Sequence, residues 1–109
     1  MTFDLTYAPN DLSSTLRREV CLATGTPDYD PNTGDIVTPA DVRMGVVFAI
    51  HGLVAVVAGV YYAGSFAQDN GAGLGQSAVF WFDTTSGGNA PAHTDFSSWL
   101  SFPVEVVGR

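Results

Sequence analysis

Three side chains in this 109-residue sequence are of types that can support nucleophilic chemistry: Cys21, His51 and His93. An imidazole beside a thiol accepts the thiol proton and so produces a reactive thiolate. No local motif places either histidine near Cys21, which sits in an apolar stretch suited to a small buried residue. A turn histidine and a surface histidine are the better interpretation, because an active site needs nucleophile, base and stabiliser within mutual reach. The sequence predicts no enzyme activity and no cofactor.

Acidic residues and asparagine alternate in DYDPNTGD (28–35), as do the first ligands of an EF-hand calcium loop. The match then fails, since Gly34 stands one position late and the final glutamate position is occupied by Pro39. Asp, Asn, Pro and Gly are also the ordinary residues of turns. We therefore expect a solvated turn here and no metal site, and two histidines with one cysteine also fall short of a zinc set.

A glycine-rich stretch, NGAGLGQS (70–77), suggests a phosphate-binding loop. It has neither the GxGxxG spacing nor a Lys-Ser/Thr pair. A strand-like stretch follows it, so no helix N-terminus is available to hold an anion. We interpret the stretch as a flexible hairpin connection.

The charge balance limits the classes of partner. Eleven acidic residues oppose four arginines, with no lysine, and the net charge is −7. Nucleic acids and anionic membrane surfaces are both held mainly by Lys and Arg, so neither is an expected partner. The single cysteine allows no internal disulfide, and the N-terminal residues MTFDLTYAPNDL lack the regions of a signal peptide. We expect synthesis and retention in a reducing cytoplasm.

Residues 45–67 contain no charged side chain and are long enough for a membrane-spanning helix. Four glycines interrupt the run, and most of its apolar residues are β-branched or aromatic, which favours strands. Divided at its glycines, the run gives GVVFAI (45–50), LVAVVA (53–58) and GVYYAGSF (59–66), each of strand length. The sequence predicts three strands, with a small membrane protein as an alternative.

The other elements complete a β-rich domain. Further strands are expected at residues 19–23, 35–38, 77–84 and 104–107, a turn at 39–41, and a short helix in FSSWLSF (96–102) that Pro103 ends. The predicted fold is mainly β: one small sandwich or barrel-like domain over residues 16–109, with one or two short helices. Residues 1–15 are expected to form an extended N-terminal arm.

Aromatic residues are more numerous than a small core readily hides. Several must fill the core, but strand alternation directs others outward, where protein interfaces use them. Apolar residues also alternate in the arm, which can add a strand to the sheet edge of another subunit. The expected contact residues for a partner or for self-association are Phe3, Leu5, Tyr7, Tyr61, Tyr62 and Trp81.

The order of these stretches resembles a family. REVCLATG (18–25), a Pro/Gly turn, DIVTPAD (35–41), GVVFAI (45–50), GVYYAGSF (59–66) and the closing FSSWLSFPVEVV (96–107) are similar to the small head decoration proteins of lambda-type tailed phages. The resemblance implies a virion structural protein without catalytic chemistry. It also implies a homotrimer on the exterior of the capsid that cements neighbouring subunits of the major capsid protein, with the N-terminal arm against the shell.

A second possibility keeps the phage context. Other small β-rich proteins form rings at the neck or tail of phage particles, and copy number per particle separates them from decoration proteins. The sequence leaves this alternative open.

Overall fold

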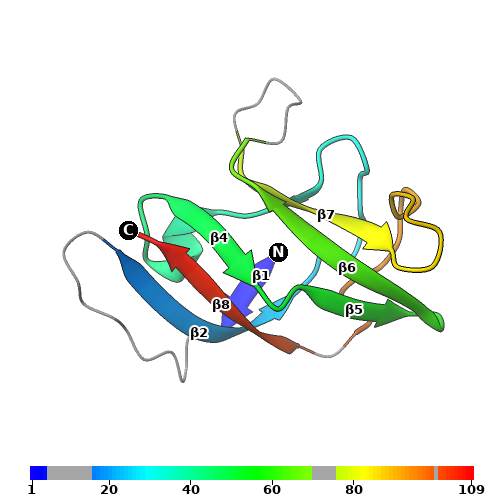
Figure 1. Ribbon diagram of the computed structural model, residues 1–109, viewed down its shortest axis with the longest axis horizontal. Helices are drawn as coiled ribbons and strands as arrows, with labels where there is room; N and C mark the ends of the chain where they lie inside the picture. The colour runs from blue at the N-terminus through cyan, green and yellow to red at the C-terminus, as the bar shows by residue number, and fades with distance from the viewer. Residues whose placement is uncertain (5–15, 70–75, 100) are drawn as a thin grey trace.

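The computed structural model describes residues 1–4, 16–69, 76–99 and 101–109. The chain is mainly β, as the sequence predicts. Eight strands and one short 3₁₀ helix make up its regular elements in the described ranges (Figure 1): β1 (Thr2–Asp4), β2 (Arg17–Thr24), β3 (Asp35–Ile36), η1 (Pro39–Val42), β4 (Val47–His51), β5 (Val54–Val57), β6 (Val60–Ala67), β7 (Ala78–Asp83) and β8 (Phe102–Gly108).

The strands form two antiparallel sheets of four strands each. The first, sheet A, has the order β1-β2-β8-β4, and the second, sheet B, has the order β3-β7-β6-β5. Sheet A therefore places the C-terminal strand β8 between two strands from the first half of the chain, as Figure 1 shows. Sheet B is built mostly from the consecutive hairpins β5-β6 and β6-β7.

The uncharged run forms β4, β5 and β6, so the prediction of three strands is confirmed. Gly52, with φ +90°, follows β4 and lets the chain leave sheet A and enter sheet B. Ala58 and Gly59 both have positive φ, which makes the two-residue turn between β5 and β6 of the type that matches strand twist. Within the described ranges, no helix has the length and hydropathy to cross a bilayer.

The predicted helix in FSSWLSF and its end at Pro103 were wrong, whereas the turn at 39–41 is confirmed. The described part of FSSWLSF forms turns and bends instead of a helix, and Phe102 already belongs to β8. Pro103 lies inside β8, where it pairs with Leu22 of β2. The proline is tolerated there because β4 joins the other side of β8 only at Glu105, so no ladder bond is lost. The expected turn at 39–41 is the 3₁₀ helix η1.

The expected free arm is partly incorporated into the domain. Thr2–Asp4 form β1, which pairs with β2 in the register Phe3↔Ala23. The Phe3 side chain is half-buried and packs against the hydrophobic core of its own chain. Phe3 therefore contacts its own core, and its predicted contact with another subunit stays a prediction for the part of its side chain that remains exposed. Leu5, Tyr7 and the rest of the predicted arm lie outside the described residues.

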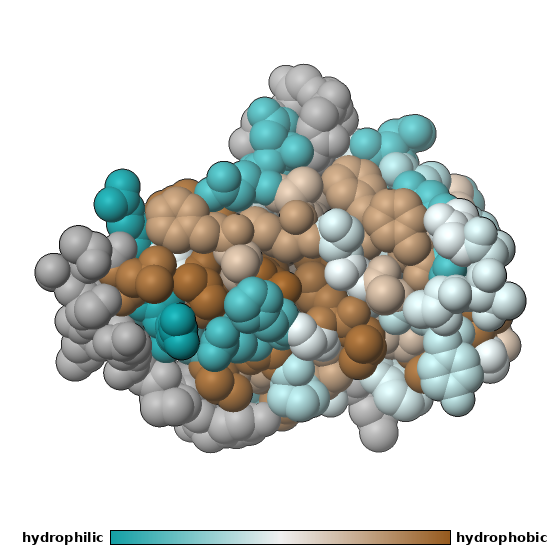
Figure 2. All heavy atoms as spheres, viewed as in Figure 1, coloured by the Kyte–Doolittle hydropathy of each residue, from teal (hydrophilic) through white to brown (hydrophobic). Residues whose placement is uncertain are grey.

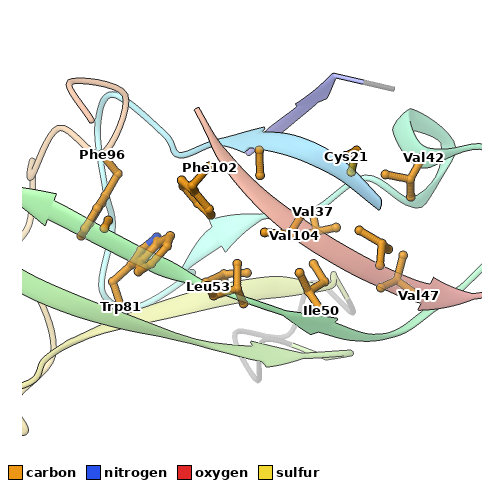
Figure 3. Close-up of a cluster of buried hydrophobic side chains, with 14 of the residues drawn as sticks. Cys21, Val37, Val42, Val47, Ile50, Leu53, Trp81, Phe96, Phe102 and Val104 are labelled. Carbon is orange, nitrogen blue, oxygen red and sulfur yellow. The ribbon is translucent and has the colours of Figure 1, made fainter. Parts of the chain in front are cut away.

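The core lies between the two sheets (Figure 3). Sheet A contributes alternate residues of β2 and β8, such as Cys21 and Val104, and sheet B contributes Trp81. Phe96, from the segment between β7 and β8, stacks on Trp81 with ring centroids 4.8 Å apart. Phe102 of β8 meets the same indole edge-on at 6.0 Å, so aromatic contacts join the two sheets at this end.

Two carboxylates are buried with the core. Asp35 places Oδ1 2.7 Å from the Met1 ammonium group, and its Oδ2 accepts hydrogen bonds from the Thr26 N–H and the Trp81 indole N–H. Glu19 accepts from Arg17 through Oε1, while its Oε2 has no hydrogen-bond partner among the described residues. Buried charges need such partners, because desolvation otherwise makes them costly.

Candidate functional site

The residues considered for nucleophilic chemistry take separate roles. Cys21 is fully buried on the core side of β2. The His51 ring pairs with Glu105 at 3.1 Å, and the His93 ring pairs with Asp28 at 2.6 Å, both on the exposed surface. Burial, followed by the nearby charges of Glu19 and Asp4, raises the pKa of the Cys21 thiol to about 11. The geometry provides no activated thiol.

Alkylation of Cys21 should accordingly be very slow in the folded protein. The thiolate is the reactive form, and raising the pKa from 9.0 to about 11 lowers its fraction near neutral pH roughly a hundredfold, before burial blocks access. Iodoacetamide labelling followed by mass spectrometry measures the rate, with the urea-unfolded chain as the control. Equal rates in the two states would show that Cys21 is open to solvent.

The acidic loop at 28–35 uses its carboxylates in local contacts. Asp30 accepts from the Asn32 N–H at 2.8 Å, as in an ordinary Asx turn, and Asp28 pairs with His93. Tyr29 points inward. Its hydroxyl donates to the Asn89 side-chain oxygen and accepts from the backbone N–H of Trp81. Among the described residues, no group of three His, Cys, Asp or Glu side chains is placed to hold a metal ion.

The glycine-rich stretch lies largely outside the described residues, which resume at Gln76. A cavity of about 510 Å³ lies beside that point. Among the described residues, its lining has no acidic, basic or thiol side chain, and it comprises Ile36, Val37, Thr38, Pro39, Gly45, Val46, Gln68, Gln76 and Ser77. Such a lining offers polar amides and hydroxyls but no group for acid–base catalysis.

The three aromatic residues expected as contact anchors on β6 and β7 separate into exposed and buried positions. Tyr61 is 65% exposed, whereas Tyr62 on the opposite face of β6 is buried against Phe96. Trp81 is fully buried in the core. The prediction of a surface contact was therefore wrong for the Tyr62 and Trp81 side chains, because strand alternation directs both of them into the core.

An apolar groove of about 410 Å³ lies around Tyr61. Strands β5 and β6 supply one side of it, and Trp99 from the segment before β8 also lines it. Val54 is 57% exposed and Trp99 is 37% exposed, so large apolar side chains meet solvent here. Every lining residue is uncharged: Val54, Ala55, Val56, Tyr61, Tyr62, Ala63, Thr84 and Trp99.

Sheet A carries a second, chemically different surface, which we call the arginine face. It is the end of sheet A where Arg17, Arg18, Arg43 and Arg109 lie together with exposed Phe48. Arg17 lies on the core side of β2 beside Glu19, and Arg18 points to the opposite, solvent side with Val20. Register brings the arginines to one end of the sheet, because Arg17 pairs with Gly108, the residue before Arg109, and Gly108 also pairs with Val47 at the start of β4. Arg17 donates to the Arg43 carbonyl, and the Arg109 guanidinium lies 5.9 Å from the centre of the Phe48 ring.

The arginine face gives the molecule a strong charge asymmetry. The four arginines of a chain of net charge −7 lie at this one end of sheet A, on both of its sides. Figure 2 shows hydrophilic and hydrophobic side chains side by side over sheet A. Basic and aromatic groups together are typical of protein interfaces, where arginine and aromatic residues are enriched.

Neither surface was fully predicted from the sequence. Val54, Trp99, Val20 and Phe48 were not among the expected contacts. The exposure of Val54 could have been predicted from strand alternation in β5. Ala55 beside it points inward, so Val54 points outward. The arginine face depends on pairing between the two ends of the chain, which one sequence does not reveal.

Comparison with known proteins gave no relative. No protein-family model, no curated protein and no solved structure matches this chain.

Proposed function

We propose that this chain is a virion structural protein that decorates and reinforces a phage head. It acts by binding, without catalysis, and its expected partner is the major capsid protein of the shell. The single observation that carries the proposal is the arginine face: the four arginines of an acidic chain lie at one end of sheet A, where Arg109 sits over exposed Phe48. The resemblance to lambda-type decoration proteins supplies the phage context.

The chemistry of this face describes the surface that it fits. Arginines beside an exposed aromatic ring bind a neighbouring protein surface that presents carboxylates around an apolar patch. The remainder of the surface is predominantly acidic, so it repels other acidic surfaces and fixes the orientation of docking. A decoration protein needs this polarity, since one side meets the shell and the other meets solvent.

Antibody labelling tests the location. Particles isolated from cells that make this chain are stained with gold-labelled antibody and viewed by electron microscopy. We expect label over the whole head surface. Label confined to the head–tail junction would favour the neck-ring alternative, and particles without label would contradict a virion role.

Changing Phe48 tests the surface. Phe48→Ser should weaken rebinding to particles stripped of this protein by roughly thirtyfold, because truncating a central aromatic contact typically costs about 2 kcal/mol. Phe48→Leu is the matched control and should rebind nearly normally. Phe48 is 42% exposed, so neither change should unfold the domain. Unchanged rebinding by Phe48→Ser would exclude this face as the shell contact.

A further inference from the structure

The four sheet edges differ in how well they are protected against pairing with another chain. At the edges of sheet A, β1 (Thr2–Asp4) carries the charged residue Asp4, while β4 is distorted by a register shift between Val47 and Ala49. In sheet B, β3 has only two residues. Short strands, charges and bulges are the devices that keep edges from associating.

The remaining edge strand, β5, is four residues long but has neither a charge nor a bulge. Its sequence is Val-Ala-Val-Val, with no charge, no proline and no bulge in its pairing with β6. An apolar, regular edge strand is an open template for a further strand. Among the described residues, β5 is thus the edge best suited to pairing.

The register shows which backbone groups are free. Gly64 donates to the Leu53 carbonyl, which makes Leu53↔Gly64 a hydrogen-bonded pair, and such pairs alternate along an antiparallel ladder. The bonded pairs are then Ala55↔Tyr62 and Val57↔Val60. The N–H and C=O groups of Val54 and Val56 point away from β6, toward the open edge, and no hydrogen bond from the described residues meets them.

We propose that β5 pairs with β5 of a second copy of this chain. The two strands run antiparallel about a two-fold axis at Ala55, so that Val54 of each copy faces Val56 of the other. This register is self-complementary, because both residues direct their N–H and C=O groups to the shared edge. The two copies of sheet B then form one continuous eight-stranded sheet, four strands from each copy.

Charge and surface chemistry favour a second copy as the occupant. Two chains of net charge −7 repel each other, and they approach at least cost where no acidic side chain is buried. The β5 edge and the groove beside it contain no charged residue. Pairing also covers the exposed Val54 side chains, and it brings the groove residues Tyr61 and Trp99 of each copy to the border of the contact.

This pairing uses a different surface from the arginine face, so the two proposals stand or fall separately. A two-fold pair also differs from the homotrimer that the lambda-type resemblance implies. Sedimentation equilibrium of the intact chain at micromolar concentrations should give a dimer. The dimer should persist or strengthen at high salt, since salt screens the repulsion between the acidic copies. Binding of the arginine face to an acidic partner should instead weaken at high salt.

Two substitutions at the edge test the contact. Val56→Pro removes an N–H that β6 does not use, so the strand is kept while each copy loses one intermolecular hydrogen bond. Dimerisation should weaken roughly tenfold or more. Val54→Lys places a charge at the same edge and should have a similar effect, which keeps the test available if Val56→Pro fails to fold. Ser65→Lys, an exposed position on the central strand β6, is the matched control and should leave the dimer intact.

Hydrogen exchange locates the contact directly. The amide protons of Val54 and Val56 should exchange slowly in the dimer and rapidly in the Val54→Lys monomer. A monomer across the whole concentration range, a trimer, or a dimer that survives both edge substitutions would each overturn the proposal. Rebinding of the Val54→Lys monomer to stripped particles reports on the proposed function independently.

Discussion

Replacing Asp35 with alanine should lower the free energy of unfolding by about 4 kcal/mol, a large share of the stability of a small domain. The carboxylate is buried, and its two oxygens serve three donors: the Met1 ammonium, the Thr26 N–H and the Trp81 indole N–H. Removing it leaves a buried positive charge without a counter-charge and two N–H groups without an acceptor. Breaking one side of a buried ion pair is among the most destabilising single changes.

Urea denaturation followed by circular dichroism measures the loss. Asp41→Ala is the control, because Asp41 is an exposed carboxylate on η1, and its removal changes net charge equally at little expected cost. The free energy of unfolding of Asp35→Asn should lie between those of Asp35→Ala and the native chain, since the amide oxygen still accepts the hydrogen bond from the Thr26 N–H. A denaturation midpoint for Asp35→Ala equal to that of Asp41→Ala would mean that the carboxylate does not hold these elements together.

The sequence predicted the strands well where local pattern decides them. Residues 45–67 divide at glycines into β4, β5 and β6, because Gly52 and Gly59 occupy positive-φ positions that strands avoid. Strand β7 was likewise visible as an apolar run between polar loops. Short-range features of this kind are encoded within a few neighbouring residues.

Long-range pairing was not predictable in the same way. Phe102 and Pro103 were assigned to a helix and its stop, yet they join β8 because β2 offers a ladder partner on one side. Tertiary pairing overrode the local signal. The inward direction of Glu19 and Asp35 was also hidden, since acidic residues in a strand or turn are usually solvated.

The candidate surfaces follow the same division. Exposure of Tyr61 was expected from strand alternation, but alternation alone did not say which of the adjacent Tyr61 and Tyr62 faces out. The arginine face joins residues from near both ends of the described chain, and the β5 edge exists only because sheet B ends there. Both surfaces are products of topology, so binding had to be inferred from the assembled fold.

Replacing Trp81 with alanine should cost about 3–5 kcal/mol, because a large buried aromatic side chain leaves a cavity that its neighbours fill only in part. The indole stacks on Phe96, meets Phe102 edge-on, and donates its N–H to Asp35. It therefore joins sheet B to sheet A and to the segment before β8. Urea denaturation followed by circular dichroism should therefore show a lower midpoint for Trp81→Ala than for the native chain.

Tyr61→Ala is the matched comparison, since it truncates an aromatic residue on the neighbouring strand of the same sheet. Tyr61 is 65% exposed, so its removal should change the free energy of unfolding by no more than about 0.5 kcal/mol. Because Tyr61 lines the groove beside β5, the same change should nevertheless weaken association between copies. The two variants thus separate stability from binding: Trp81→Ala lowers the urea midpoint, and Tyr61→Ala shifts only the dimerisation measured by sedimentation. Equal losses of stability would mean that Tyr61 is packed as tightly as Trp81, and the exposed groove would then be excluded as a contact surface.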